Sequence, residues 1–228
     1  MNVNQTLIGG FLCVFIAISG CGKSAKKNAH VTPSVFGAAI STVAGMLKPS
    51  AKPVDPRTQI TRQAIDASAV PVLFASIKSR NAFATLSSAG KNRNVETWVS
   101  ADGISLSFKR GIVVATRGLG HDLMAADTSD VFKVINAGRG DAIRIHDYLN
   151  GEDQIYQRSF YCTVRTRGRE VLHIFEVDTS TRHVIESCNN PEMTLKNHYW
   201  IANSGKVIQS KQWVGPEIQY VFTQQLSR

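Results

Sequence analysis

The chain has 228 residues, of which 43% are hydrophobic and 19% are charged, and its formal net charge is +9. Residues 1–57 hold six of the lysines and arginines against a single acid, so the rest of the chain is only mildly basic. Because no basic helix or RNA-binding motif accompanies this charge, the composition excludes nucleic acid as the expected partner and leaves room for an anionic one.

The first twenty residues predict export. Residues 7–20 read LIGGFLCVFIAISG, an apolar run of the length of a signal-peptide core and too short to cross a membrane comfortably. It ends in Ile18-Ser19-Gly20-Cys21, the aliphatic-small-small-Cys pattern that the lipoprotein signal peptidase reads. We therefore predict a signal peptide over residues 1–20 and lipidation of Cys21. An ordinary secretory signal or an anchor helix is the alternative, since no Lys or Arg precedes the run.

The residues after Cys21 predict a membrane-anchored tether. Residue 22 is Gly, and no Asp is present there to signal retention in the inner membrane, so the expected location is the outer membrane, facing the periplasm. A Cys21 lipid with two or three acyl chains would anchor stably where one chain would not. We predict a flexible tether over residues 21–57, with a possible short helix at 35–47. Its cations would contribute up to about 1 kcal/mol each beside anionic lipid.

Residues 58–228 predict one β-rich domain. A short helix is expected at 61–70, before Pro71, and a helical turn at 128–134. Strands are expected over 72–80, 94–103, 104–110, 112–117, 154–167, 170–178, 181–188, 198–203, 206–214 and 218–226, with turns at 167–169, 178–180, 203–205 and 215–216. Many short strands at about ten-residue spacing indicate an all-β, mostly antiparallel barrel-like or half-barrel domain with one or two short helices.

Two cysteines remain in the mature domain, Cys162 and Cys188, in a compartment that permits disulfides. We favour a bridge between them. If they lay on the first and third strands of a meander, however, they would be roughly 9.6 Å apart. A disulfide needs Cα atoms within about 7 Å, so two buried free thiols are the alternative.

Residues 111–127, GIVVATRGLGHDLMAAD, run from a β-branched strand into a glycine-rich turn. The third glycine and the lysine of phosphate-binding loops are missing, which argues against nucleotide binding. Adjacent His121 and Asp122 diverge on a turn and do not make a catalytic pair. We predict a strand-end turn with positive φ at its glycines. We expect Arg117, Gly118, Gly120 and Asp122 to form the rim of a surface or pocket; Arg117 and Asp122 could pair or face a partner.

Trp200 and Trp213 have the spacing of inward positions on successive strands. Core packing is the expected role, and a sugar-stacking platform with Lys211 beside it is the functional alternative. Carboxylates that a glycosidase would need are present without a recognisable acid-pair motif; they are Asp102, Asp122, Asp127, Glu176 and Glu186. The histidines lack metal-ligand spacing. We therefore predict no catalytic residue, no metal site and no cofactor.

Several ordered motifs together resemble the YjbF/GfcB family of group 4 capsule polysaccharide lipoproteins. They are the lipobox, ETWVSADG (96–103), GIVVATRGLGHDLMAAD (111–127), RSFYCTV (158–164), RHVIESC (182–188) and NHYWIANSGKVIQSKQWVGP (197–216). The resemblance covers roughly residues 70–228 and the signal. It implies an outer-membrane lipoprotein of capsule or exopolysaccharide secretion with a mostly antiparallel barrel-like domain, and it brings no catalytic residues.

The leading functional hypothesis is a non-enzymatic accessory lipoprotein of polysaccharide secretion or assembly. Its expected partners are membrane lipid, through the acyl anchor, and an acidic polysaccharide or the export proteins. A half-barrel that carries an acyl chain is one alternative. A polysaccharide-modifying enzyme is another, and it predicts a catalytic role for Asp102 or Asp122.

Overall fold

The computed structural model describes residues 54–227. The predicted signal peptide, Cys21 and the possible helix at 35–47 lie outside the described residues. Within residues 54–227, no helix combines the length and the apolar character that a membrane span requires.

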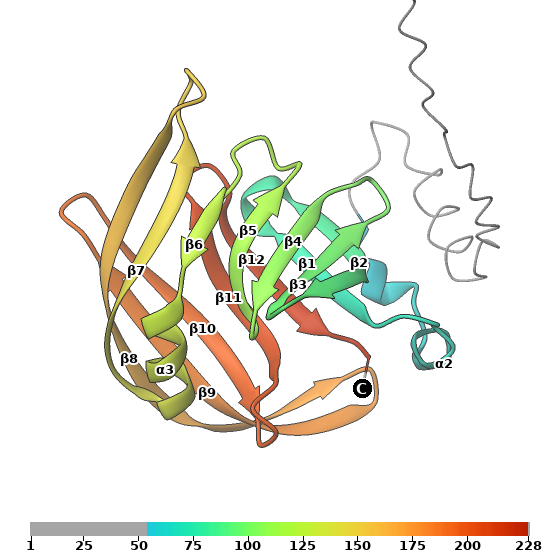
Figure 1. Cartoon of the computed structure of the whole chain (residues 1–228). Helices are drawn as coiled ribbons and strands as arrows, with labels where there is room; N and C mark the ends of the chain where they lie inside the picture. Colours follow the sequence, from blue (N-terminus) through green and yellow to red (C-terminus); the bar gives the residue numbers. More distant parts are fainter. Residues whose placement is uncertain (1–53, 228) are drawn as a thin grey trace, which may run out of the picture. The chain divides into compact units, whose positions relative to one another are not determined.

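The described chain consists of strands with two short α-helices and two 3₁₀ turns (Figure 1). The helical elements are η1 (Pro56–Thr58), α2 (Arg62–Asp66), η2 (Lys78–Arg80) and α3 (Ser129–Ala137). The strands are β1 (Val72–Ile77), β2 (Ala82–Asn92), β3 (Val95–Ser100), β4 (Ser105–Lys109), β5 (Ile112–Arg117), β6 (Ala125–Asp127), β7 (Arg139–Leu149), β8 (Ile155–Ile174), β9 (Val177–Asn189), β10 (Thr194–Ala202), β11 (Val207–Gly215) and β12 (Gln219–Gln225).

The strands form one antiparallel sheet in the order β5-β4-β3-β2-β1-β12-β11-β10-β9-β8-β7-β6. Nearly every strand therefore neighbours the strands that precede and follow it in the chain. The pairing of β1 with β12 joins the N-terminal meander to the C-terminal one. The sheet curls into a nearly closed barrel, which confirms the predicted all-β, antiparallel class (Figure 1).

The two ends of the sheet, β5 and β6, meet at the seam of the barrel (Figure 1). The backbone N–H of Thr116 donates to the carbonyl of Leu123 there, at 2.9 Å. Gln212 of β11 reaches β5 and bonds the N–H of Val113 and the carbonyl of Gly111, both at 2.9 Å. These bonds satisfy backbone groups that an open sheet edge would leave unpaired.

Helix α3 closes the same side of the barrel next to β7. Its buried residues Val131 and Ile135 pack with Ile112 of β5 and Tyr199 of β10. Full burial of an aliphatic side chain of this size contributes about 1.5–3 kcal/mol. The predicted helical turn at 128–134 is therefore a true helix that extends three residues further, to Ala137.

The longest hairpin differs from the prediction. Residues expected to form three strands form two, because β8 runs for 20 residues without interruption. The turn falls at Phe175 and Glu176, whose φ angles of 46° and 64° fit a two-residue type I′ hairpin turn. The predicted turns at 167–169 and 178–180 are wrong; the first is a β-bulge between Thr166 and Gly168.

Strands β2, β6 and β7 were not predicted, and the helix expected at 61–70 is limited to Arg62–Asp66. The reason is clearest in β7, where the usual alternation is inverted. Arg144 and His146 point into the barrel and are buried, whereas Ile143 is 48% exposed on the outside. A pattern search that places aliphatic residues inside does not recognise such a strand.

The end of the predicted tether contacts the barrel. The guanidinium of Arg57 donates to Gln224 of β12 at 2.8 Å and lies 4.1 Å from the ring centre of Phe74. Asp55 accepts from Arg57 and caps η1. Residues from Asp55 onward are thus held against the barrel.

Candidate functional site

Cys162 and Cys188 form a disulfide that joins β8 to β9. The two residues are directly opposite each other in the antiparallel pair, with Cα atoms 3.9 Å apart. The predicted bridge is therefore confirmed. The geometric objection to it fails because it placed the two cysteines on the first and third strands of three, whereas β8 and β9 are neighbours.

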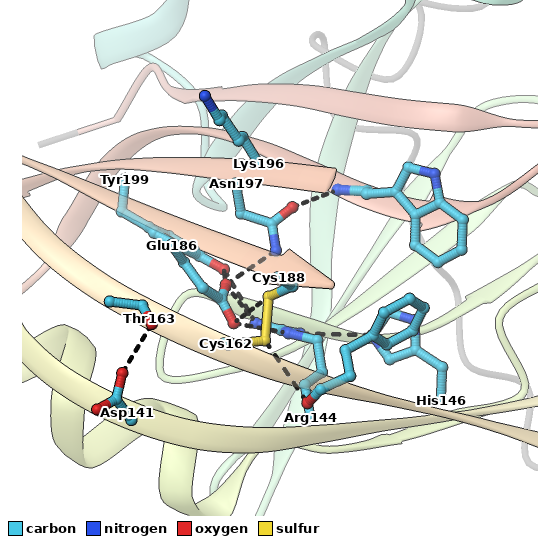
Figure 2. Close-up of a disulfide and its surroundings, with 12 residues drawn as sticks. Asp141, Arg144, His146, Cys162, Thr163, Glu186, Cys188, Lys196, Asn197 and Tyr199 are labelled. Carbon is cyan, nitrogen blue, oxygen red and sulfur yellow. Dashed lines mark hydrogen bonds and ion pairs between the residues drawn. A yellow bond between two sulfur atoms is a disulfide. The ribbon is translucent and has the colours of Figure 1, made fainter. Parts of the chain in front are cut away.

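A buried ion pair lies next to the disulfide inside the barrel (Figure 2). Arg144 donates from Nε and Nη2 to the two carboxylate oxygens of Glu186, at 2.9 and 2.8 Å. Tyr199 and Asn197 each donate to the same Oε2 at 2.8 Å. The side chains of Arg144 and Glu186 are 2% and 0% exposed. Every polar atom at the centre of the network thus has a partner, as a buried charge requires.

The electrostatics of this network are those of a permanent ion pair. Burial alone would lower the pKa of Arg144, but the Glu186 carboxylate and Tyr199 raise it above its ordinary value. Burial, reinforced by Glu186, raises the pKa of Tyr199. Glu186 is therefore occupied as an acceptor and does not fit the role of a general acid. It lies near both cysteine sulfurs, but the disulfide leaves no thiolate there for a metal.

A chain of hydrogen bonds continues from the ion pair along β7. Nδ1 of His146 lies 2.9 Å from the hydroxyl of Tyr148, which donates to the carbonyl of Val214 at 2.9 Å. The imidazole stacks on the indole of Trp213, with ring centres 5.7 Å apart and planes 10° apart. Trp213 is 4% exposed, so its ring belongs to the core rather than to a surface platform.

We expect His146 to make the protein less stable as the pH falls. Burial, and then the positive charge of Arg144, hold its pKa well below the ordinary value. In the unfolded chain His146 has the ordinary histidine pKa of about 6.5. Below that pH the unfolded chain therefore binds a proton that the folded state does not bind. The free energy of unfolding is therefore highest above about pH 6.5 and decreases as the pH drops below it.

The measurement is urea unfolding between pH 7.5 and 5. His146→Gln is expected to flatten the dependence on pH, whatever its effect on absolute stability. His173→Gln is the control, because the His173 side chain is 70% exposed. If the free energy of unfolding depended on pH equally in the two variants, His146 would not be the source of the pH dependence.

The glycine-rich turn at the barrel seam is held together by its own polar side chains. Asp122 accepts from the N–H groups of Gly118 and Leu119, at 3.0 and 3.2 Å, and from the hydroxyl of Thr116, at 2.7 Å. Arg117 donates to the carbonyls of Thr116, Leu123 and Met124. Gly118 and Gly120 have φ of 87° and 81°, which confirms the expected positive values.

Arg117 and Asp122 therefore bond the loop backbone rather than each other. Their hydrogen-bonding capacity is used to fix the turn that closes the seam, and their part in a binding rim stays a prediction. Asp102 behaves similarly, since it accepts from the hydroxyl of Ser100 inside its own hairpin turn.

A basic groove of about 600 Å³ lies on the outer face of β8, β9 and β10. The residues that line it are Thr163, Arg165, Thr166, Arg167, Ile185, Ser187, Lys196 and His198. The strand register explains this set, because Arg165 is opposite Ile185 and Ile185 is opposite His198. Figure 2 shows Lys196 extending away from the interior, where its neighbour Asn197 points.

Positive charge predominates in the groove, although Glu170, which is not part of its lining, interacts electrostatically with Arg167. Arg165, Arg167 and Lys196 are exposed, and no acid is among the lining residues. None of the three has an ion pair within residues 54–227. Arg167 belongs to the β-bulge of β8, a feature that often redirects a side chain next to a functional site.

Lys211 and Trp200, two of the predicted binding residues, lie beside this groove. Lys211 is exposed on β11 opposite His198, and its Nζ lies 4.4 Å from the ring centre of Tyr220. Trp200 is on β10, two residues after His198. The structure therefore brings Lys211 and Trp200 to one face and separates them from Trp213 and the 117–122 turn.

The groove could not be predicted because its residues come from three strands, and only the register between β8, β9 and β10 brings Arg165 and Arg167 onto one face with Lys196 and His198.

A hydrogen-bonded relay connects His198 of the groove to the partly exposed carboxylate of Glu170. Glu170 accepts from the indole N–H of Trp200 at 2.8 Å, and its other oxygen lies 2.9 Å from Nδ1 of His183. Nε2 of His183 lies 3.0 Å from Nδ1 of His198. The His183 side chain is 2% exposed, and its ring stacks on Trp200 with centres 4.3 Å apart.

The relay fixes the charge states of its ends. The hydrogen bond from Trp200, together with His183, holds the pKa of Glu170 below its ordinary value, so this carboxylate is ionised at neutral pH. Burial lowers the pKa of His198, and the neighbouring His183 and the cations around the groove lower it further. His198 is therefore neutral at pH 7.

Comparison with protein families gives a match over most of the chain. Residues 28–226 match the YjbF family, described as group 4 capsule polysaccharide lipoprotein GfcB, YjbF. The chain belongs to this family. The resemblance seen in the sequence is confirmed, and family membership makes the protein a capsule-related lipoprotein.

The fold is similar to that of a solved structure. The chain resembles the crystal structure of the hypothetical lipoprotein YmcC from Escherichia coli (K12), with a TM-score of 0.68 and 17% identity over 87% of this chain and 98% of that one. A putative exported protein with a YmcC-like fold from Bacteroides fragilis matches with a TM-score of 0.28 and 10% identity over 69% of this chain and 93% of that one. A comparison with curated proteins gives no match.

Proposed function

We propose that this protein is a non-enzymatic accessory factor in the secretion or assembly of capsule or exopolysaccharide. It is anchored through a lipid on Cys21 in the outer membrane, with its barrel in the periplasm. Membership of the capsule polysaccharide lipoprotein family supports the role. The lipobox before Cys21 and the Gly that follows it support the placement.

The basic groove is the part of the molecule that contacts the polymer in this proposal. The observation that carries it is the set of exposed cations Arg165, Arg167 and Lys196 in one groove whose lining contains no acid. Strands β8 and β10 are two spacings apart, roughly 9.6 Å, so their cations face different parts of a ligand. An extended acidic chain matches that arrangement better than a single small anion.

The interior offers less support for the other two hypotheses. The carboxylates considered for catalysis include Glu186 and Asp122, and both are fully engaged as structural acceptors. An acyl chain inside the barrel would have to pack against the buried Arg144–Glu186 pair and the stacked ring of Trp213. No observation on the described residues favours either function.

The test is deletion of the gene followed by complementation with variants of the full-length protein. Deletion is expected to lower surface polysaccharide several-fold, and the wild-type gene to restore it. Arg165→Ala/Arg167→Ala is expected to restore little of it, because the groove loses two of its charged hydrogen-bond donors.

Lys78→Ala/Lys91→Ala is the matched control, because it removes the same charge from exposed sites on η2 and β2, away from the groove, and is expected to complement fully. Unchanged polymer after deletion would refute the role in secretion. Equal complementation by both double variants would refute the role of the groove.

A further inference from the structure

Tyr161 is the only exposed side chain among the Phe, Trp and Tyr residues within 54–227. It is 51% exposed on the outer face of β8, and Ile143, directly opposite on β7, is 48% exposed. A tyrosine ring offers a large, rigid contact area at a low cost in conformational entropy, which is why tyrosine is common in binding surfaces. Tyr161 and Ile143 thus form an apolar surface that the described chain leaves open to solvent.

These two side chains line a pocket of about 350 Å³ where α3 meets β7. The charged residues of its lining are Asp130, Lys133 and Asp141. Lys133 donates to Asp130 at 2.9 Å, so the carboxylate of Asp141 has no partner among the cations of the lining. Asp141 accepts from the hydroxyl of Thr163 at 2.7 Å, as Figure 2 shows. Because a carboxylate has about four acceptor sites, Asp141 retains capacity for further donors.

The pocket continues directly into the basic groove. Three cross-strand pairs follow one another along the outer face of β7 and β8: Ile143 with Tyr161, Asp141 with Thr163, and Arg139 with Arg165. The surface therefore changes from apolar, through polar, to basic over a stretch of roughly 13 Å along the strands. Thr163 belongs to both parts, because it lines the groove and bonds Asp141. A polymer that lies along β8 contacts both.

The chemistry of the pocket suits an uncharged sugar. The apolar face of an aromatic ring packs on the C–H groups of a pyranose, and a carboxylate accepts strong hydrogen bonds from its hydroxyls. Desolvation, and then the nearby Asp141 carboxylate, raise the pKa of Tyr161, so the ring is uncharged at neutral pH. A uronic acid in the same place would bring a second carboxylate close to Asp141, and the two would repel each other.

We propose that the pocket is a second subsite, which binds an uncharged sugar residue of the polymer while the groove binds an acidic one. The uncharged residue stacks on Tyr161 and donates hydroxyl hydrogens to Asp141, and the acidic residue pairs with the arginines of the groove. This inference rests on the proposed function. It narrows the polymer to a polysaccharide that contains both acidic and uncharged sugars.

Isothermal titration calorimetry of the full-length protein in detergent micelles, with two oligosaccharides of equal length, tests the subsite. Hyaluronan alternates a uronic acid with an uncharged N-acetyl sugar, whereas oligogalacturonate has a carboxylate on every residue. Tyr161→Ala is expected to weaken hyaluronan binding about three- to tenfold, the scale of one aromatic contact. It is expected to leave oligogalacturonate binding unchanged, because the groove alone holds that polymer.

Three further variants make the measurement specific. Tyr161→Phe keeps the ring and is expected to retain most of the hyaluronan binding. Asp141→Ala removes the acceptor and is expected to weaken hyaluronan by a similar factor, while oligogalacturonate binds equally or slightly more tightly because a repulsive charge is lost. Ile155→Ala is the matched control, since Ile155 is 71% exposed on the same strand but lines neither the pocket nor the groove. It is expected to bind both oligosaccharides like the wild type.

The outcomes distinguish the inference from the function beneath it. If Arg165→Ala/Arg167→Ala loses affinity for both oligosaccharides and Tyr161→Ala binds both like the wild type, the inference is overturned and the groove still binds acidic polymer. Equal weakening of both by Tyr161→Ala would place a uronic acid on the ring and would also overturn it. If neither oligosaccharide binds the wild-type protein, the polymer-binding role of the groove falls, and the inference falls with it.

Discussion

Glu186→Gln is expected to lower the free energy of unfolding by about 3–5 kcal/mol, the largest effect of any single substitution proposed for this protein. The substitution nearly preserves volume but leaves the guanidinium of Arg144 buried without a counter-charge. Arg144 is 2% exposed and makes its two shortest bonds to this carboxylate. Tyr199 and Asn197 also lose an ionised acceptor. Urea unfolding followed by tryptophan fluorescence measures the change.

Two further variants make this measurement specific. Arg144→Met/Glu186→Leu removes both charges and is expected to be more stable than Glu186→Gln, since an apolar pair avoids an uncompensated charge. Lys133→Ala breaks an ion pair whose side chains are 74% and 65% exposed, and it should cost no more than about 0.5 kcal/mol. A loss below 1 kcal/mol for Glu186→Gln would show that the interior tolerates a lone guanidinium and would contradict our account.

Removal of the disulfide by Cys162→Ala/Cys188→Ala is expected to cost about 3.5 kcal/mol. The bridge joins residues separated by 26 positions. Closing a loop of that length lowers the entropy of the unfolded chain, which raises the free energy of the unfolded state by about this amount. Both cysteines are buried, at 0% and 2% exposure, so alanine also loses packing around the sulfurs. The unfolding free energy of the double variant, compared with that of the oxidised wild type, gives the result.

Reduction supplies the control for this effect. Wild-type protein unfolded and refolded in the presence of reductant should lose most of the same free energy, whereas the double variant should be indifferent to reductant. A double variant as stable as the oxidised wild type would mean that pairing of β8 with β9 alone holds this hairpin.

The fold class could be predicted because most strands alternate in the ordinary way. In β4, Leu106 and Phe108 alternate with polar residues and face the core, and turns such as Asp102-Gly103 have compositions that favour hairpins. The missed strand β7 shows the limit of this reasoning. Its inward positions carry Arg144 and His146. These polar side chains are stable inside the barrel because they form hydrogen bonds there with Glu186 and Tyr148.

The candidate groove could not be predicted for a related reason. Its cations come from β8 and β10, and β9 lies between them. One incorrectly placed turn divided β8 and hid the register that brings Arg165 level with His198. Successive side chains of a strand point to opposite faces of the sheet. An error in the position of a turn therefore places the residues that follow it on the wrong face.

From the sequence by itself the antiparallel β class, the family and the glycine turn over residues 118–120 could be predicted, because each is indicated by short patterns of residues close together in the chain. Only the tertiary structure decided that Glu186 neutralises Arg144, that Cys162 faces Cys188, and that the cations of two strands share one outer groove. Those relations depend on strand register, which is set by the summed packing of all twelve strands and by one two-residue turn between β8 and β9. The composition of a short segment does not determine this packing. The Arg144–Glu186 pair and the surface groove can therefore be recognised only from the complete sheet.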